Sequence, residues 1–148
     1  MLRLFIEHDP NPRAFHATCR FLDLLDGGSA GPRASEPALD PLVLSFQLKL
    51  LWLAGYLPHL ASCAGCDGPG ALVAFSAAAG GGVCEDCAAG SIRLSAAGFL
   101  GMRGLLERPL AAAQDAGLTT AAARETLRVI EGLYEYHGGF RLRTLAAH

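Results

Sequence analysis

Hydrophobic positions recur at helical spacing in four stretches of the chain, and glycine-rich or polar segments separate them. The first stretch, residues 12–26, places apolar side chains three or four positions apart, which predicts an amphipathic helix that packs through one face. That face consists of Phe15, Cys19, Leu22 and Leu25, widened by Phe21 and Leu24. The segment that follows, residues 28–39, is rich in Gly, Ser, Ala and Pro and is typical of a linker.

The second stretch starts at Asp40-Pro41, a capping residue followed by a proline that fits the first turn of a helix. The sequence that follows, "LVLSFQLKLLWLAGYLPHL", is apolar in nearly every direction around a helix. A helix of that kind lies at the centre of its domain, so we expect the core to form around it. Gly55 is placed as its C-terminal stop.

Two further helices are predicted after residue 92. Ser95 can cap "AAGFLGMRGLLER", and Thr120 can cap "AAARETLRVIEGLYEYH". In the first of these, Gly98, Gly101 and Gly104 recur every three residues, each costing about 1 kcal/mol relative to alanine. We expect close contact with another helix to offset that cost.

Residues 59–91 break the helical pattern. They hold four of the five cysteines and seven glycines, with one strand-like stretch, "ALVAFS", followed by "AAAGGG" and "VC". This order predicts a β-hairpin with a loose connection. The resulting fold class is mainly α: a helical bundle formed by residues 1–58 and 92–148, with an inserted four-cysteine zinc ribbon at 59–91.

The cysteines of this segment form two C-x-x-C pairs separated by seventeen residues: Cys63 with Cys66, and Cys84 with Cys87. Two intervening residues let both thiolates of a pair point into one tetrahedral site, and the hairpin brings the second pair beside the first. The spacing therefore favours one structural Zn²⁺. Two disulfides, another metal or a redox centre are the weaker alternatives. Gly65 and Gly68 are expected to adopt positive φ angles that direct backbone N–H groups at the sulfurs.

Acidic residues surround this predicted metal site. Asp67, Glu85 and Asp86 lie beside the cysteines, and residues 59–91 contain no Lys or Arg. Four thiolates and one Zn²⁺ add two further negative charges, which repel phosphate. We therefore expect the ribbon to be a structural staple or a protein contact, and not a surface that reads DNA. It also has few large apolar residues, so metal binding must supply its folding energy.

Composition places the chain in the size range of one domain. Its 148 residues are 51% hydrophobic, yet no run of 18 or more apolar residues is present to span a bilayer. The start, "MLRLFIEHDP", does not resemble a signal peptide, so a reducing cytoplasm is expected, where paired cysteines bind metal. Of the net charge of −2, residues 1–92 contribute −4 and residues 93–148 contribute +2, with arginine as every cation of the second part. Any phosphate contact should therefore come from that part.

Motifs of enzyme chemistry are absent from the sequence. It has no G-x-x-x-x-G-K-[ST] loop, no G-x-G-x-x-G after a strand and no H-E-x-x-H pair. His59 precedes Cys63 by four residues and could replace a ligand, but the quartet of cysteines is already complete. A closed four-thiolate site leaves no position for a catalytic water, so we do not expect an enzyme.

Three features together resemble the DNA repair protein RecO family. They are an apolar helix that runs into "LAGYLPHLASCAGC", two C-x-x-C pairs around a hairpin with "FSAAAGG" before the second pair, and the ending "YHGGFRLRTL". Members of this family begin with an OB-fold domain, and no part of this chain has that pattern. The resemblance is therefore to the C-terminal helical and zinc portion. An unrelated zinc-ribbon adaptor between proteins is the alternative.

The resemblance implies a non-enzymatic recombination mediator in the bacterial cytoplasm, associated with the nucleoid and not with a membrane. Such a protein engages RecR, single-stranded DNA and the acidic-apolar C-terminal tail of single-strand-binding protein, anneals complementary strands and helps to load recombinase. Without the OB-fold, DNA binding is expected to be weak. The tail needs an apolar groove and a cation for its carboxylates. The candidate cations, for the tail or for DNA, are Arg124, Arg128, Arg141 and Arg143.

Overall fold

The computed structural model describes residues 12–26 and 37–138. Within these ranges the chain is mainly helical with one small antiparallel sheet, so the predicted fold class is confirmed. The α-helices are α1 (Pro12–Asp26), α2 (Pro41–Leu53), α3 (Ala96–Glu107) and α4 (Thr120–Gly138). The strands are β1 (Ala74–Ser76), β2 (Gly81–Val83) and β3 (Ile92–Arg93), and the 3-10 helices are η1 (Pro37–Leu39), η2 (Glu85–Cys87) and η3 (Leu110–Ala116). No helix in the described part of the chain is long and apolar enough to cross a bilayer.

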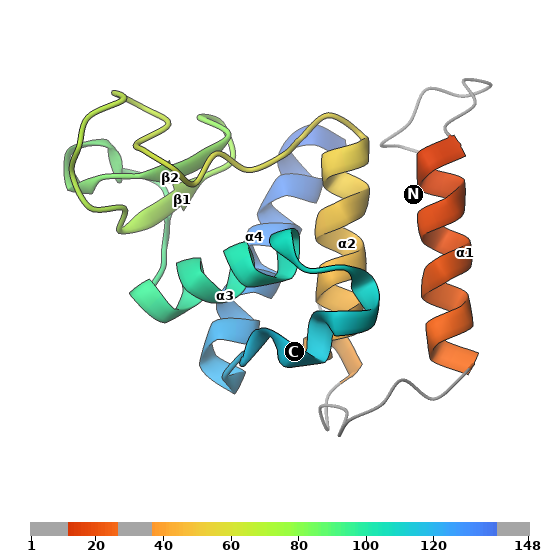
Figure 1. The fold of residues 1–148 in the computed structure, drawn as a ribbon. Helices are drawn as coiled ribbons and strands as arrows, with labels where there is room; N and C mark the ends of the chain where they lie inside the picture. The colour runs from red at the N-terminus through yellow and green to blue at the C-terminus, as the bar shows by residue number, and fades with distance from the viewer. Residues whose placement is uncertain (1–11, 27–36, 139–148) are drawn as a thin grey trace.

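Helix α2 is the centre of the fold, as its apolar sequence predicts. Figure 1 shows it between α1 on one side and α3 and α4 on the other. Its buried side chains divide between two clusters. Leu44, Leu48 and Leu51 pack in the main core with residues of α3 and α4, whereas Leu42, Phe46 and Leu50 pack with α1. Both clusters depend on this one helix.

Both ends of α2 are where the sequence places them. The Asp40 side chain accepts a hydrogen bond of 2.9 Å from the backbone N–H of Leu42, which satisfies one of the free donors of the first turn. After the last turn, Gly55 has φ of 95°, and the N–H of Tyr56 donates to the carbonyl of Leu51 at 2.8 Å. This is the glycine-terminated helix end that the sequence predicts.

The predicted packing face of α1 is confirmed at Phe21, Leu24 and Leu25 and is wrong at Phe15 and Leu22. Phe15 is 67% exposed and Leu22 is 52% exposed. The side chains that pack against α2 are those of Ala14, Ala17, Phe21, Leu24 and Leu25, so the buried face is shifted toward the Phe21 side of the helix. The rings of Phe21 and Phe46 stack with their centroids 4.1 Å apart. Because this stack turns the Phe21 side of α1 inward, the line through Phe15 and Leu22 is left in solvent.

The predicted linker at 28–39 is ordered at its end. Residues 37–39 form η1, and Ala38 and Leu39 are buried in the main core. Residues 28–36 lie outside the described part of the chain. Two apolar residues directly before a capped helix are enough to anchor the segment there, which composition alone does not reveal.

Helices α3 and α4 are each capped at the N-terminus by the side chain of the residue directly before the helix. The Ser95 hydroxyl accepts from the N–H of Gly98 at 3.1 Å, as predicted. For α4 the cap is Thr119, whose hydroxyl accepts from the N–H of Ala122 at 3.1 Å, one residue earlier than predicted. Either threonine can serve, and the position of the first turn decides between them.

The glycines of α3 are explained by close packing at two of the three positions. A Cβ atom at Gly98 would overlap the carboxylate of Glu125 on α4, and one at Gly101 would overlap the side chain of Leu118. The expected close contact is therefore confirmed at both. Gly104 differs, because the nearest atom to a Cβ there would be the Cβ of Ala116 at 3.7 Å, an ordinary contact distance.

Replacing Gly104 by alanine is expected to stabilise the protein. The substitution adds no clash and removes the helix-propensity deficit of glycine, so the free energy of unfolding should rise by about 0.5–1 kcal/mol. Denaturant unfolding of Gly104→Ala and Gly101→Ala measures the contrast. A destabilised Gly104→Ala variant would contradict the packing described for this end of α3.

The sheet has the strand order β2-β1-β3, with both neighbours antiparallel to β1. Phe75 pairs with Gly82 on one side and with Ile92 on the other. The β1–β2 pair is the predicted hairpin. The third strand, Ile92–Arg93, was not predicted, because two residues are too few to show strand alternation.

Strand β1 joins the cysteine segment to the helices. Phe75 is buried in the main helical core, whereas Ala74, its neighbour on the opposite face, packs in a small cluster with Val83, Cys63 and Cys84. In Figure 1 the sheet lies on the side of α3 and α4 that is far from α1. One strand thus fixes the cysteine loops relative to the core.

Candidate functional site

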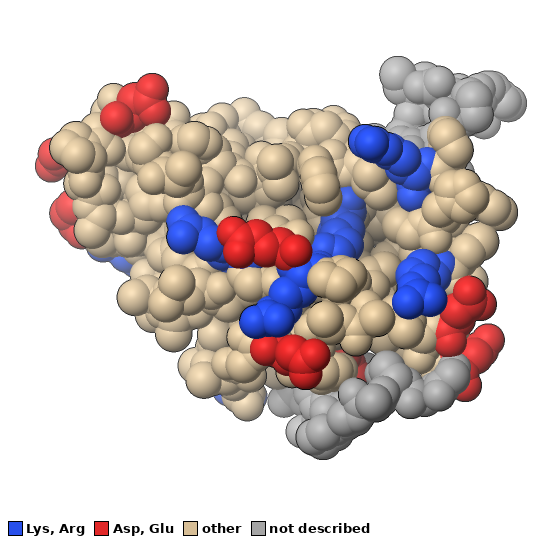
Figure 2. All heavy atoms as spheres, viewed as in Figure 1, with Lys and Arg blue, Asp and Glu red and all other residues tan. Residues whose placement is uncertain are grey.

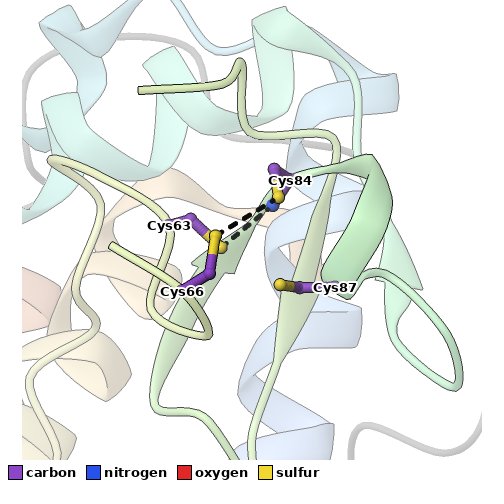
Figure 3. Close-up of side chains that lie close together, drawn as sticks. All are labelled: Cys63, Cys66, Cys84 and Cys87. Carbon is purple, nitrogen blue, oxygen red and sulfur yellow. Dashed lines mark hydrogen bonds between the residues drawn. The ribbon is translucent and has the colours of Figure 1, made fainter. Parts of the chain in front are cut away.

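The four paired cysteines come together at the open end of the sheet. Cys63 and Cys66 lie in the loop before β1, and Cys84 and Cys87 lie at the two ends of η2, directly after β2. Figure 3 shows their side chains directed toward one common space. All four sulfur atoms lie within 4.8 Å of one another. The cluster that the spacing predicts is therefore present.

The spacing of these sulfurs fits a tetrahedral metal. Zn–S bonds of about 2.3 Å in tetrahedral geometry place the sulfurs about 3.8 Å apart. The Sγ atoms of Cys66 and Cys84 are 3.8 Å apart, well beyond the roughly 2.05 Å of a disulfide. All five cysteines are free. The donor set is four soft sulfurs, which suits zinc and leaves no position for water.

The four thiols influence one another's ionisation, and a bound cation would allow all of them to be deprotonated. The backbone N–H of Cys84 donates to the sulfur of Cys63 at 3.3 Å, and this bond lowers the pKa of Cys63 to about 6. The nearby sulfurs, that of Cys63 first, raise the pKa of Cys87 to about 12. Without a metal, one thiolate therefore opposes ionisation of another. A divalent cation removes that opposition, since metal-bound thiols are deprotonated.

The backbone of the first cysteine loop differs from expectation. Asp67 has φ of 60°, and Gly65 and Gly68 do not have positive φ. The N–H of Asp67 donates to the carbonyl of Cys63 at 2.8 Å, which closes the turn. Gly65 is needed for space instead, because a Cβ atom there would lie 3.0 Å from the Cys87 sulfur. An aspartate can adopt this left-handed conformation, so sequence alone favoured the wrong residues.

Ser62 links the loop to the segment before it. Its hydroxyl donates to the Asp67 carboxylate at 3.1 Å and lies 2.9 Å from Nε2 of His59. The aspartate thus binds the serine and not the imidazole, which is the reverse of a catalytic triad. The three side chains brace the loop, and the order of their contacts is not that of a catalytic triad.

The acidic surroundings of the cluster are partly neutralised. Arg93 of β3 donates to both carboxylate oxygens of Glu85, one of them at 2.8 Å. The guanidinium lowers the pKa of that carboxyl. Arg93 lies two residues beyond the predicted ribbon. The sequence-based expectation that only acidic residues surround the cysteines therefore did not include it. Asp67 and Asp86 keep the surface at the cysteines acidic.

Two of the four candidate arginines lie in the described part of the chain, both on α4 and not on the cysteine loops. Arg124 and Arg128 are exposed on α4, one turn apart, as their spacing predicts. Arg141 and Arg143 lie outside the described part of the chain. The grouping of all four arginines therefore stays a prediction.

A groove lies between α2 and the end of α3, at a position that the sequence does not locate. It has a volume of about 580 Å³ and is lined by Lys49, Trp52, Leu57, Leu106, Glu107, Arg108 and Pro109. Trp52 is 48% exposed and Leu57 is 52% exposed, so the groove offers open apolar surface. Figure 2 shows Lys and Arg side chains in the middle of the face that carries α2 and α3, with acidic side chains directly beside them.

Two cations border this groove and differ in availability. The ammonium of Lys49 donates to the carbonyls of Leu105, Leu106 and Arg108 at 3.1, 3.2 and 2.7 Å, so all three donors are used to cap α3. Burial lowers the pKa of Lys49. Arg108 is exposed, and its guanidinium makes no ion pair with another described residue. It is the cation that a ligand can reach.

The contact between Lys49 and the end of α3 spans more than fifty residues of sequence. Periodicity along one helix cannot reveal such a contact. A lysine within the apolar stretch "LVLSFQLKLLWL" is the one signal that could have indicated it, because a charge there needs partners.

The chain is similar in sequence to proteins of one known family. Residues 1–146 match the family described as "Recombination protein O C terminal". The chain is 33% identical over 141 residues to "DNA repair protein RecO" of Anaeromyxobacter sp. (strain K), covering 92% of this chain and 52% of that protein. It is 36% identical over 105 residues to the protein of the same name from Myxococcus xanthus (strain DK1622), covering 68% and 40%. No solved structure gives a significant match.

The match covers only part of the length of each relative. The chain spans about half the length of the curated relatives that it matches over most of its own length. Nearly the whole of this chain is nevertheless covered by the family of C-terminal regions. The chain therefore belongs to the RecO family and corresponds to the C-terminal region of its members.

Proposed function

We propose that this chain is the C-terminal module of a non-enzymatic mediator of DNA repair and recombination. In this role it engages the tail of single-strand-binding protein, RecR and single-stranded DNA, and so promotes strand annealing and recombinase loading. Family membership supports the repair role, since the matched relatives are named as DNA repair proteins. The observation that carries the binding role is the groove, which combines apolar walls with the accessible guanidinium of Arg108.

The cysteine cluster is proposed to hold one structural Zn²⁺ through Cys63, Cys66, Cys84 and Cys87. The separation of the sulfurs and the all-sulfur donor set support this assignment. When bound, the ion supplies a cross-link between the two loops and no open coordination position. The chain's own contribution is to aim the sulfurs: β1 and β2 hold the loops at a fixed distance, and Gly65 leaves room beside Cys87.

The groove is proposed to take the acidic-apolar tail of single-strand-binding protein. An apolar side chain of the tail fits against Trp52 and Leu57, and a carboxylate pairs with Arg108. Glu107 lies on the same wall and repels that carboxylate, so neutralising it should tighten binding. This proposal places the tail in the groove, and not at the arginines that the sequence analysis named as candidates.

Arg124 and Arg128 are proposed to contact phosphates of single-stranded DNA. Both are exposed on α4 and on one helix face. Arg141 and Arg143 are proposed to extend this contact, on the basis of sequence alone. Two or a few phosphate contacts give weak and salt-sensitive binding.

The tail and DNA assignments are tested together by two charge-reversal variants. The chain has a single tryptophan, Trp52, in the groove, so its emission reports occupancy by an unlabelled tail peptide. Arg108→Glu should weaken peptide binding about tenfold or more and leave oligonucleotide binding unchanged. Arg128→Glu, the matched control, should do the reverse. Amidation of the terminal carboxylate of the peptide should reproduce the effect of Arg108→Glu.

Two other outcomes of this titration would contradict the assignment of the tail to the groove. Weaker peptide binding by Arg128→Glu, with Arg108→Glu unaffected, would return the tail site to α4. No saturable binding by a folded, zinc-loaded chain would contradict the tail-binding role itself. Circular dichroism of both variants confirms that each remains folded.

A further inference from the structure

The four cysteines of the cluster differ in how far solvent reaches them. Cys63 and Cys84 are buried, Cys87 is half-buried and Cys66 is exposed. Gly68 leaves space beside the Cys66 sulfur, because a Cβ atom at that position would lie only 3.2 Å from it. Cys66 is therefore the cysteine of the cluster that a small molecule in solution reaches most easily.

Exposure decides which of these sulfurs an oxidant attacks. The thiolate, and not the thiol, is the reactive form, and metal-bound thiols are all deprotonated. A bound metal therefore makes the four sulfurs alike in ionisation and leaves access as the difference between them. Oxidation-sensitive cysteines are exposed and lie next to a second cysteine that can form a disulfide. Cys66 meets both conditions, since its sulfur is 3.8 Å from that of Cys84 (Figure 3).

We propose that Cys66 is an oxidation site, at which hydrogen peroxide produces a disulfide with Cys84 and so releases the metal. Metal occupancy of the cluster then depends on the redox state of the chain. The inference rests on the zinc site proposed above, and it is independent of the groove and of the arginines on α4.

The proposed reaction consumes one peroxide and two thiolates. The Cys66 thiolate attacks one peroxide oxygen, so the O–O bond breaks, hydroxide leaves and the sulfur becomes a sulfenic acid. The Cys84 thiolate then attacks that sulfur, so the S–S bond forms, the S–O bond breaks and a second hydroxide leaves. Two protons from solvent convert both hydroxides to water. The two sulfurs are thereby oxidised and the peroxide is reduced.

The geometry favours a link between the two cysteine loops. Sulfurs that are 3.8 Å apart need to approach by less than about 2 Å to reach the length of a disulfide bond. Cys66 precedes β1 and Cys84 follows β2, so the disulfide joins the same two loops that the metal joins. Cys63 and Cys87 remain as thiols, and they are too few to hold zinc in a four-sulfur site. A thiol reductant with added zinc should restore the metal-bound cluster.

Zinc release during a titration with hydrogen peroxide tests the proposal. The zinc-loaded Cys19→Ser chain is used, because it keeps only the four cysteines of the cluster. A chromogenic chelator should detect release of the zinc as peroxide is added. Gly68→Ala in this background places a methyl group beside the Cys66 sulfur and should slow the release several-fold. Gly70→Ala is the matched control, since its methyl group would lie against the Cβ of Cys84, and it should react at the unmodified rate.

Mass spectrometry after alkylation of the remaining thiols identifies the disulfide. Residues 59–91 contain no Lys or Arg, so trypsin leaves all four cysteines on one peptide. Cleavage after acidic residues instead separates Cys66 from Cys84, because Asp67 lies between them. The expected product is a Cys66–Cys84 link with the other two cysteines alkylated.

The two measurements separate this inference from the zinc site on which it rests. A zinc-loaded chain that keeps its metal in peroxide overturns the inference alone. A first disulfide within either C-x-x-C pair, or equal rates for Gly68→Ala and Gly70→Ala, also overturns it. A purified chain that binds no zinc before oxidation contradicts the metal site, and metal release falls with it.

Discussion

Cys63→Ser is expected to abolish metal binding and to unfold the cysteine segment. Cys63 is fully buried, and its sulfur accepts the N–H of Cys84 while facing the other three sulfurs. An oxygen at this position is a poorer ligand for zinc, and the remaining cluster of Ala74, Val83 and Ala88 is small. Structural zinc sites supply roughly 10 kcal/mol in isolated zinc-finger peptides, so a loss of at least about 3 kcal/mol of stability is expected here.

Metal content and thermal unfolding together measure this effect. The matched control is Cys19→Ser, since Cys19 is the one cysteine outside the cluster. It should retain full metal content and an unchanged melting temperature. Chelation of the wild-type protein should reproduce the effect of Cys63→Ser. Full thermal stability of a metal-free Cys63→Ser variant would refute a structural role for the metal.

Gly81→Ala is expected to be the most damaging single methyl addition in the described chain. The main chain of β2 lies against residue 59: the N–H of His59 donates to the carbonyl of Gly80 at 2.9 Å, and the N–H of Gly82 donates to that of His59 at 2.8 Å. A Cβ atom at Gly81 would overlap the His59 carbonyl oxygen and lie 2.8 Å from its nitrogen. Backbone cannot move aside as a side chain can, so we expect a loss of about 3 kcal/mol.

Gly70→Ala is the matched control for Gly81→Ala. Gly70 is in the same segment, and a Cβ atom there would lie 3.4 Å from the Cβ of Cys84, close to ordinary contact. Its free energy of unfolding should change by no more than about 0.5 kcal/mol. Urea unfolding of the three zinc-loaded proteins makes the comparison. Equal stability of Gly81→Ala and wild type would contradict the close passage of residue 59 along β2.

Local chemistry made much of the fold predictable. The ends of α2 follow from Asp40 and Gly55, whose cap and positive φ depend on neighbouring residues only. The cysteine cluster follows from two C-x-x-C pairs on either side of a hairpin, because this spacing restricts where the sulfurs can lie. The family follows from the same stretches in order, and it excludes an unrelated zinc-ribbon adaptor.

The features that the sequence did not predict depend mostly on contacts between distant parts of the chain. Helix α1 has apolar residues on two faces, and only the stack on Phe46 determines which face turns inward. The groove exists because Lys49 holds the end of α3 beside Trp52, a contact between distant parts of the chain. The left-handed turn at Asp67 also escaped prediction, since glycines stand nearby and favour that conformation more strongly.

The central claim is that four cysteines enclose one zinc ion that holds the sheet and its loops in shape. Zinc K-edge absorption of the purified chain, combined with elemental analysis, tests it most directly. The account predicts one zinc per chain with four sulfur neighbours at about 2.3 Å and no lighter ligand. Zinc with three or fewer sulfur neighbours, or a folded chain that contains no metal, would contradict it.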